Sequence, residues 1–487
     1  MTTHSSYAPS SLNESFLTKW PGVKPLPFLI VLCLGLGLWH LPVPDGLDIQ
    51  TWHLFAIFVA TIFAIIAKPL PMGAISILSL AICVGTKTLT LQESLSSFSS
   101  RIVWLVLFAF FIARGFVKTG LGSRISYFFV QTFGKNTLGL SYALVLSDLL
   151  LAPTVPSNTA RGAGILFPIV SSLSKEQGSC HTKGTQRHLG AFLIKVIFHS
   201  NLITSAMFVT AMAGNPLIIS LAADVGVHLT WSGWAMATLV PGLVNLTLLP
   251  LFLYVLYPPE LKKTPEAPAS ARLKLKEMGR LSFEESAMMV TFISLLVLWV
   301  FGQQLGIDST SAALMGLAAL LFTGVLTWED ILHEKSAWAT LIWFSILLMM
   351  AGQLTKMGMV NWFSIKMEGA VVAYHWGIAF SILSLVYLYS HYLFASATAH
   401  ISSMYSAFLV VMIAAGTPPQ LAALSLAILS SLCACLTHYG TGTAPVYYGS
   451  GYVSVADWWR FGGLTSLLHL AVWSIVGGLW WKALGIW

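Results

Sequence analysis

The feature that most constrains the fold is a series of apolar stretches that are long enough to cross a lipid bilayer. A spanning helix needs about 20 predominantly apolar residues. Peptide groups cannot be left unpaired in hydrocarbon, so such stretches must form helices. We therefore expect an all-α polytopic membrane protein with about eleven transmembrane helices. They lie near residues 27–44, 51–67, 71–86, 103–118, 188–210, 233–257, 286–304, 310–326, 337–355, 418–436 and 460–484.

Composition agrees with this assignment and excludes several functions. Only 9% of the 487 residues are charged, compared with about 25% in soluble domains. The formal net charge of +7 does not indicate nucleic-acid binding, because membrane proteins collect Lys and Arg in cytoplasmic loops. The five cysteines form no CxxC pair, which favours small buried side chains over a metal or redox centre. We predict no metal and no cofactor.

A basic, proline-rich linker at 258–285 divides the chain into halves at 27–257 and 286–487. Its basic residues indicate a cytoplasmic location. With six stretches before the linker and five after it, the segment 1–26 would also be cytoplasmic and the C-terminus outside. That segment lacks the apolar core of a signal peptide. We expect a multi-pass protein of the cell membrane, most naturally the bacterial inner membrane.

The two halves repeat a pattern. Trp104–Gly120 and Trp343–Gly358 each begin with Trp, place a Gly shortly before a Lys and end with Gly. An amphipathic stretch follows each one. Next comes an apolar stretch interrupted by polar residues, near 137–172 and 374–415, which predicts two re-entrant hairpins. Two such halves entering from opposite sides would form an inverted repeat.

Polar motifs interrupt both hairpins. They read Ser157-Asn158-Thr159-Ala160-Arg161 and Ser396-Ala397-Thr398-Ala399-His400. Gly/Pro/Thr breaks follow in both halves, at residues 210–216 and 440–445. One such motif alone would more often be a helix cap or a kink. Matched breaks in two halves instead indicate the binding site of a transporter.

The chemistry of these breaks favours an anion. Helix N-termini offer free N–H groups and a positive dipole end. Two facing tips suit a four- or five-carbon dicarboxylate. Arg161 and His400 stand at equivalent places, and we interpret them as built-in cations that replace bound sodium and favour obligatory exchange. The alternative is an Arg that fixes a loop and a neutral core His.

Other polar residues in apolar segments have less specific interpretations. Asp148 is a candidate proton carrier, although pairing with a nearby base is favoured. Lys195, His199 and Asn201 either line the transport path or pack against it. The pair at 438–439 is a further candidate for lining the site.

The strings at 152–162, 392–400 and 436–452 resemble those of the divalent anion:sodium symporter (DASS) family. The likeness is strongest to its exchanger branch of bacterial citrate or tartrate:succinate antiporters and chloroplast 2-oxoglutarate/malate translocators. The resemblance implies scaffold and transport domains, a homodimer and elevator-type movement. It also implies a substrate site made of Ser157, Asn158, Thr159, Ser396, Ala397, Thr398, Thr441, Gly442, Gly214 and Asn215.

Two departures from the sodium-coupled pattern bear on coupling. Ala397 replaces the second tip's Asn, and Pro153 stands where a hydroxyl is usual. We therefore expect sodium-independent exchange of dicarboxylates of the succinate, malate, fumarate and 2-oxoglutarate type. A sodium- or proton-coupled di- or tricarboxylate symporter is the alternative. An intramembrane enzyme is disfavoured, because the sequence contains neither HExxH nor GxSxG.

Overall fold

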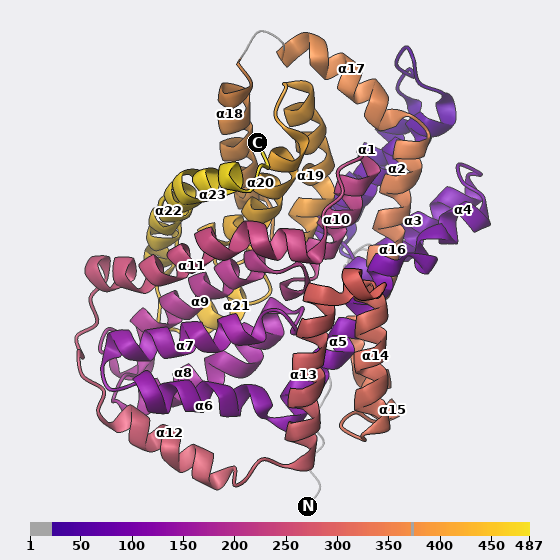
Figure 1. The fold of residues 1–487 in the computed structure, drawn as a ribbon. Helices are drawn as coiled ribbons and strands as arrows, with labels where there is room; N and C mark the ends of the chain where they lie inside the picture. The colour runs from indigo at the N-terminus through magenta and orange to yellow at the C-terminus, as the bar shows by residue number, and fades with distance from the viewer. Residues whose placement is uncertain (1–21, 372–374) are drawn as a thin grey trace, which may run out of the picture.

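A computed structural model describes residues 22–371 and 375–487. These residues form helices joined by short loops (Figure 1), and apart from one isolated bridge between Asn136 and Lys263 they contain no strand pairing. Ten of the described helices are long and apolar enough to cross a membrane. The all-α prediction is confirmed. Residues 1–21 of the expected cytoplasmic segment lie outside the described residues.

Each of the eleven predicted spans coincides with a helix. The helices are α1 (Pro25–His40), α2 (Ile49–Ala67), α3 (Met72–Gly85), α5 (Arg101–Thr119), α9 (Gly190–Met207), α11 (Trp231–Leu256), α13 (Phe283–Phe301), α14 (Ser309–Phe322), α16 (Lys335–Lys356), α20 (Pro419–Leu432) and α22 (Val455–Val472). The count by length is ten because α1, α3 and α14 have only 14 to 16 residues. Both arms of the second hairpin reach 18 residues when the first is counted through the turn that ends at Leu393.

The two interrupted stretches form helical hairpins close to their predicted bounds. The first consists of α7 (Thr137–Leu151), the π-helical turn η3 (Ala160–Leu166) and α8 (Phe167–Glu176). The second consists of α18 (Trp376–Ser390) and α19 (Ala397–Ala414). Each polar motif lies where the chain reverses between the two arms. A π-helical turn is rare and often marks a functional position.

The order of elements repeats in the two halves, as the sequence pattern indicated. A long helix is followed by an amphipathic helix, a hairpin, a broken helix and a second long helix. The first half uses α5, α6 (Leu121–Phe133), α7–α8, α9 with η5 (Val209–Ala211) and α10 (Gly214–Asp224), and α11. The second uses α16, α17 (Met359–Val371), α18–α19, α20 with η8 (Cys433–Leu436) and α21 (Ala444–Gly449), and α22 with η9 (Trp473–Gly477) and α23 (Gly478–Ala483).

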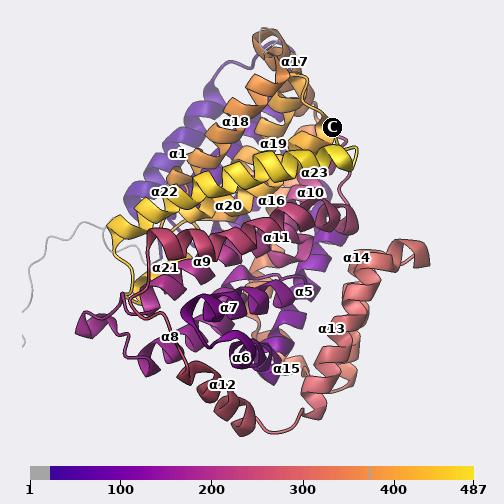
Figure 2. The ribbon, with the colours of Figure 1, turned by 60° about the vertical axis from the view of Figure 1, so that its left-hand side comes forward.

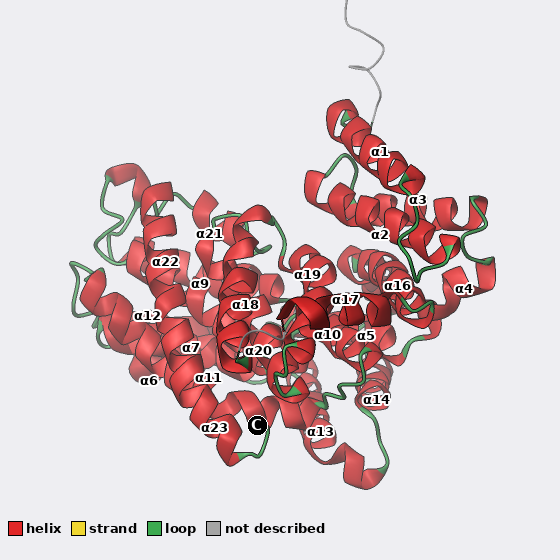
Figure 3. Cartoon of the chain, turned by 90° about the horizontal axis from the view of Figure 1, so that it is seen from above, coloured by secondary structure: helices red, strands yellow, loops and turns green. Residues whose placement is uncertain are grey.

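The helices gather into two groups that lie on opposite sides of the molecule when it is seen from above (Figure 3). The scaffold group contains α1–α3, α4 (Leu91–Leu95), α5, α13, α14, α15 (Trp328–His333) and α16, with α5 packed against α14 and α16. The hairpin group contains α7–α9, α11 and α18–α23, with α9 packed against α7, α11 and α20. Helices α10 and α17 contact both groups.

The linker at 258–285 is more ordered than its proline content suggests. It contains helix α12 (Glu266–Glu277), which packs along α6 at the edge of the molecule (Figure 2). Arg124 of α6 forms an ion pair with Glu285 at 2.6 Å and donates to the carbonyl oxygens of residues 278 and 279. The linker is therefore held against the first half of the chain through its contacts with α6.

Candidate functional site

The two polar tips meet at one cavity of about 710 Å³ between the scaffold group and the hairpin group. The tips enter from the hairpin group, and helices α5 and α16 close the opposite side. Eight of the predicted site residues line this cavity: Ser157, Asn158, Thr159, Ser396, Ala397, Thr398, Thr441 and Gly442. Motifs about 240 residues apart in the sequence are thus brought together.

The two tip serines cap the outgoing arms of their hairpins. Ser157 Oγ accepts a hydrogen bond from the Ala160 N–H at 3.1 Å, and Ser396 Oγ accepts one from the Ala399 N–H at 3.4 Å. In such a cap the next two N–H groups have no partner within the helix. These belong to residues 158 and 159 in one tip and to 397 and 398 in the other. Each tip therefore presents a positive helix end to the cavity.

The first tip touches the second broken helix directly. Asn158 Nδ2 donates to Thr441 Oγ1 at 3.0 Å, and both side chains are buried. A Cβ atom added to Gly442 would lie 2.5 Å from Thr159 Oγ1, so only glycine permits this approach without displacing the threonine. The two halves of the chain form a single site.

Gly214 and Asn215 are not among the residues that line the cavity. Asn215 Nδ2 instead donates to the carbonyl oxygens of Ser205 at 2.7 Å and Phe208 at 2.8 Å. These bonds stabilise the break between α9 and α10. That break reaches the cavity through Met212 and Ala213. Substrate binding by residues 214 and 215 stays a prediction, without a cavity contact in this conformation.

Arg161 is fully buried behind the first tip. Its Nη1 donates to the carbonyl oxygens of Val155 and Ala211, both at 2.6 Å, and its Nε pairs with Asp148 at 3.1 Å. The preferred interpretation of Asp148, a carboxylate paired to a base, is confirmed. Arg161 therefore joins the first tip to the first broken helix, as a bound cation would, and Asp148 balances its charge.

His400 is also fully buried and does not line the cavity. Its Nε2 lies 2.9 Å from Ser390 Oγ, and the Ser390 hydroxyl donates to the Tyr387 carbonyl at 2.8 Å. Because that hydroxyl hydrogen is used, Ser390 Oγ accepts and His400 Nε2 carries a proton. Among the described residues, Nδ1 has a contact with Cys433 Sγ, at 3.9 Å. These contacts suit a neutral imidazole, and the predicted cationic role of His400 stays a prediction.

The remaining polar candidates pack inside the hairpin group. Lys195 Nζ lies 3.5 Å from the centre of the Tyr257 ring, His199 contacts Thr465, and Asn201 donates to Asp148 at 3.0 Å. The packing interpretation of these three residues is therefore the correct one. Residues 438 and 439 do not line the cavity either; they bond to Trp459 and to the backbone of residue 392.

Sequence reasoning missed two ionisable residues in the cavity lining, Arg114 and Glu334. Arg114 lies in the last turns of α5, with 42% of its side chain exposed and Nε 3.9 Å from Asp330. In the sequence Arg114 looks like a charge near the end of a membrane span, and Glu334 looks like an ordinary loop charge before one. Arg114 could have been found from its position inside the repeated Trp104–Gly120 string. Among the described residues that line the cavity, Arg114 is the cationic side chain.

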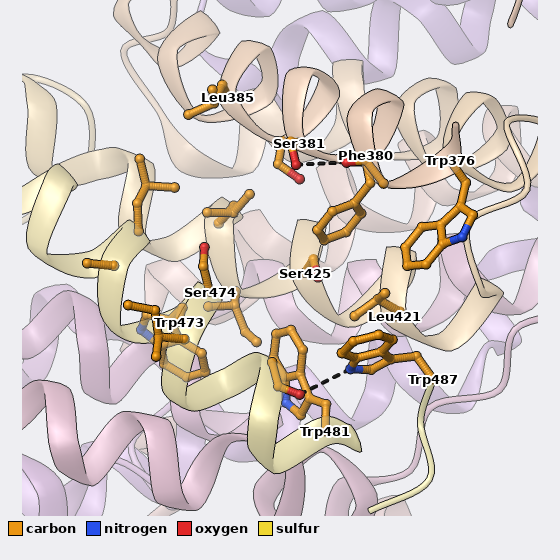
Figure 4. A pocket seen from close by; sticks show the side chains of 18 residues that line it. Trp376, Phe380, Ser381, Leu385, Leu421, Ser425, Trp473, Ser474, Trp481 and Trp487 are labelled. Carbon is orange, nitrogen blue, oxygen red and sulfur yellow. Dashed lines mark hydrogen bonds between the residues drawn. The ribbon is translucent and has the colours of Figure 1, made fainter. Parts of the chain in front are cut away.

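A second cavity, of about 590 Å³, lies between α18, α20 and α23 (Figure 4). Its lining is aromatic and aliphatic, including Trp376, Phe380, Trp481 and Trp487, and contains no ionisable side chain. The Ser381 hydroxyl in this lining donates a hydrogen bond to the carbonyl oxygen of residue 377, at 2.8 Å. The described lining of this cavity offers a carboxylate no cationic side chain.

Comparison with known proteins identifies the family. Residues 23–487 match the family described as "Sodium:sulfate symporter transmembrane region". The chain belongs to this family. It is 57% identical to "Putative malate transporter YflS" of Bacillus subtilis (strain 168), over 98% of this chain and 100% of that protein. It is 49% identical to "Dicarboxylate transporter 1, chloroplastic" of Spinacia oleracea, over 96% of this chain and 83% of that protein.

The fold agrees with this membership. The crystal structure of the Alcanivorax borkumensis YdaH transporter superposes with a TM-score of 0.54 and covers 90% of this chain and 98% of that one, at 14% sequence identity. The predicted resemblance to the DASS family is confirmed. This member of the family is a membrane transport protein and not an enzyme.

Proposed function

We propose that this family member exchanges dicarboxylates such as malate, succinate, fumarate and 2-oxoglutarate across the cell membrane. The observation that carries the proposal is the meeting of both capped tips at one cavity. Two helix N-termini on one cavity suit a molecule with a carboxylate at each end. The names of the relatives, a putative malate transporter and a chloroplast dicarboxylate transporter, support the same substrate class.

Sodium independence is part of the proposal. Ala397 gives the second tip a methyl group where an amide would offer a ligand oxygen. Behind the first tip, the carbonyl oxygens of Val155 and Ala211 receive the Arg161 guanidinium. Such carbonyls would suit a sodium ion if no side-chain cation were present. A permanent cation in place of sodium leaves no ion to be taken up with the substrate, which favours exchange over sodium-coupled symport.

The division into two groups of helices supports an elevator-type movement. The cavity has one side on α5 and α16 and the other on the hairpin group, so movement of the hairpin group past the scaffold group would expose the site alternately. We further propose a homodimer formed through the scaffold group, with a cytoplasmic N-terminus and an external C-terminus.

The test uses purified protein in liposomes loaded with unlabelled malate or succinate, with choline replacing sodium on both sides. We expect uptake of labelled dicarboxylate into loaded liposomes and none into empty ones. Ser402→Ala is a suitable control variant, because its hydroxyl returns to its own helix at the carbonyl of Ala399. Sodium-dependent uptake into empty liposomes would instead identify a symporter. Uptake driven only by a proton gradient would identify the proton-coupled alternative.

A further inference from the structure

We propose that His391, His400 and Cys433 form a binding site for a thiophilic d10 metal ion, Zn²⁺ or Cu⁺. The three residues come from different elements: the turn η7 (His391–Leu393), helix α19 and the turn η8. One ligand atom from each lies within 4.8 Å of the other two, and all three side chains are fully buried. The sequence pattern did not reveal this cluster, because its ligands are not spaced as a local motif.

The distance between His400 and Cys433 is close to that of a metal site, and the other ligand pairs, within 4.8 Å, would close by side-chain rotation. Metal–nitrogen bonds of about 2.05 Å and metal–sulfur bonds of about 2.3 Å at a tetrahedral angle hold nitrogen and sulfur about 3.6 Å apart. His400 Nδ1 and Cys433 Sγ are already 3.9 Å apart. Imidazole and thiolate are also the ligands that Zn²⁺ and Cu⁺ prefer.

The hydrogen bonds around the two imidazoles leave the correct nitrogens free. His391 Nε2 lies 3.0 Å from the Gly440 carbonyl, which can only accept, so this nitrogen carries the proton. His391 Nδ1 then carries a lone pair and no proton, and this nitrogen is buried without a hydrogen-bond partner among the described residues. The bond to Ser390 fixes the same tautomer in His400. Both free lone pairs are on Nδ1, and outer hydrogen bonds of this kind are typical of metal-binding histidines.

The unpartnered nitrogen favours a ligand over simple packing. A buried acceptor that has lost its water and gained no partner is costly, and a metal ion would remove that cost. The Cys433 thiol now donates weakly to the Ser430 carbonyl at 3.3 Å. On binding, the thiol would release its proton to solvent and the sulfur lone pair would form the metal bond. The thiolate complex is then neutral with Cu⁺ and carries one positive charge with Zn²⁺.

The site would couple the second tip to the second broken helix. His400 follows the tip by two residues, and His391 holds the carbonyl of Gly440, which precedes the cavity residues Thr441 and Gly442. A bound ion would therefore fix the positions of both segments. Metal binding itself does not depend on the proposed substrate, so its failure and the failure of dicarboxylate exchange would be separate results.

The test measures metal content in the full-length protein, purified without a histidine tag and treated with a chelator. We would add Zn²⁺ or, under reducing and anaerobic conditions, Cu⁺, remove the excess and measure ions per chain by elemental analysis. We expect about one ion per chain, since three protein ligands make a single site. Co²⁺ in place of Zn²⁺ should also give a thiolate-to-metal absorption band.

Cys433→Ser and His391→Asn should reduce metal content at least tenfold and abolish the Co²⁺ band. Cys435→Ser is the matched control, because Cys435 is equally buried two residues away and its thiol faces the Gly462 carbonyl at 3.5 Å. If Cys433→Ser fails to fold, His391→Asn and the Co²⁺ band of the unchanged chain still decide the question. Absence of bound metal in the unchanged chain, or equal binding in Cys433→Ser and Cys435→Ser, would overturn the proposal.

Discussion

Asn158 in the first half of the chain donates a hydrogen bond to Thr441 in the second half, at 3.0 Å and across 283 positions of sequence. The amide and the hydroxyl both line the central cavity. An amide that is fixed in this way keeps its oxygen and second hydrogen in a defined direction. The geometry of the site therefore depends on both halves at once.

Asn158→Ala should abolish most dicarboxylate exchange while the protein still folds. Loss of a hydrogen bond to a charged group costs about 1.5–3 kcal/mol, which corresponds to a decrease of about tenfold or more. Labelled malate uptake into malate-loaded liposomes measures the effect, with Ser402→Ala as the control. Near-normal exchange by Asn158→Ala would show that the tip does not bind substrate.

Arg114→Gln should raise the KM for dicarboxylate about fivefold, because a partly exposed charge pair contributes roughly 1 kcal/mol. The effect should shrink at high ionic strength, which screens exposed charges. Lys118→Gln is the matched control. Lys118 lies one turn away on α5 but pairs with Asp330 at 2.5 Å and does not line the cavity. Equal KM values for the two variants would contradict a binding role for Arg114.

Arg161→Gln should destabilise the protein strongly, because it leaves the Asp148 carboxylate buried without its cation. Such a loss typically costs about 3–5 kcal/mol. The double variant Arg161→Gln/Asp148→Asn should recover much of that stability, as measured by thermal unfolding in detergent.

The same double variant tests whether the charge of Arg161 serves transport. We expect a folded protein that no longer exchanges dicarboxylates in the absence of sodium. Full sodium-free exchange by the double variant would mean that Arg161 only positions the first tip.

Asp330 predicts a pH dependence of stability. Partial burial opposes its ionisation, but hydrogen bonds from Lys118 and Thr327 outweigh burial and lower its pKa from 3.8 to about 2. Because the folded pKa is the lower one, Asp330 stabilises the fold above about pH 4, and this contribution is lost as the pH falls towards 2.

Asp330→Asn should therefore lower the Tm at pH 7, and its difference from the unchanged chain should shrink as the pH is lowered from 5 to 3. Glu329→Gln provides the control, because Glu329 is 71% exposed and pairs with His333. A Tm difference that is constant with pH would show that the Asp330 charge is not responsible.

The spans, hairpins and tips were predictable because their signals are local. A run of apolar residues fixes a helix, and polar residues inside such a run mark a break. The partners of Arg161 were less predictable. Its Asp148 contact lies 13 residues away, within reach of sequence reasoning, but its contact with the Ala211 carbonyl depends on how two broken segments pack.

Helix α12 and the role of Arg114 show what sequence patterns miss. The prolines at 265 and 268 suggested an open linker, yet Pro265 precedes α12 and Pro268 falls in its first turn, where proline is tolerated. Arg114 lies on an apolar span, and the other cavity residues of that span are Phe110, Ala113 and Val117. The repeated string could draw attention to Arg114, but the position of the hairpin tips opposite α5 shows that it lines the cavity.

The central cavity is lined by both the scaffold group and the hairpin group, and this has a pharmacological consequence. In the proposed elevator-type movement, a dicarboxylate held by the hairpin tips alone would travel with them. A longer molecule that also contacts Arg114 and Glu334 on the scaffold side would be bound to the scaffold group and the hairpin group at once. Such a compound would trap a single conformation, so it would inhibit exchange and raise the melting temperature together. Inhibitors of this transporter should therefore be designed for length across the cavity rather than for closer imitation of the substrate.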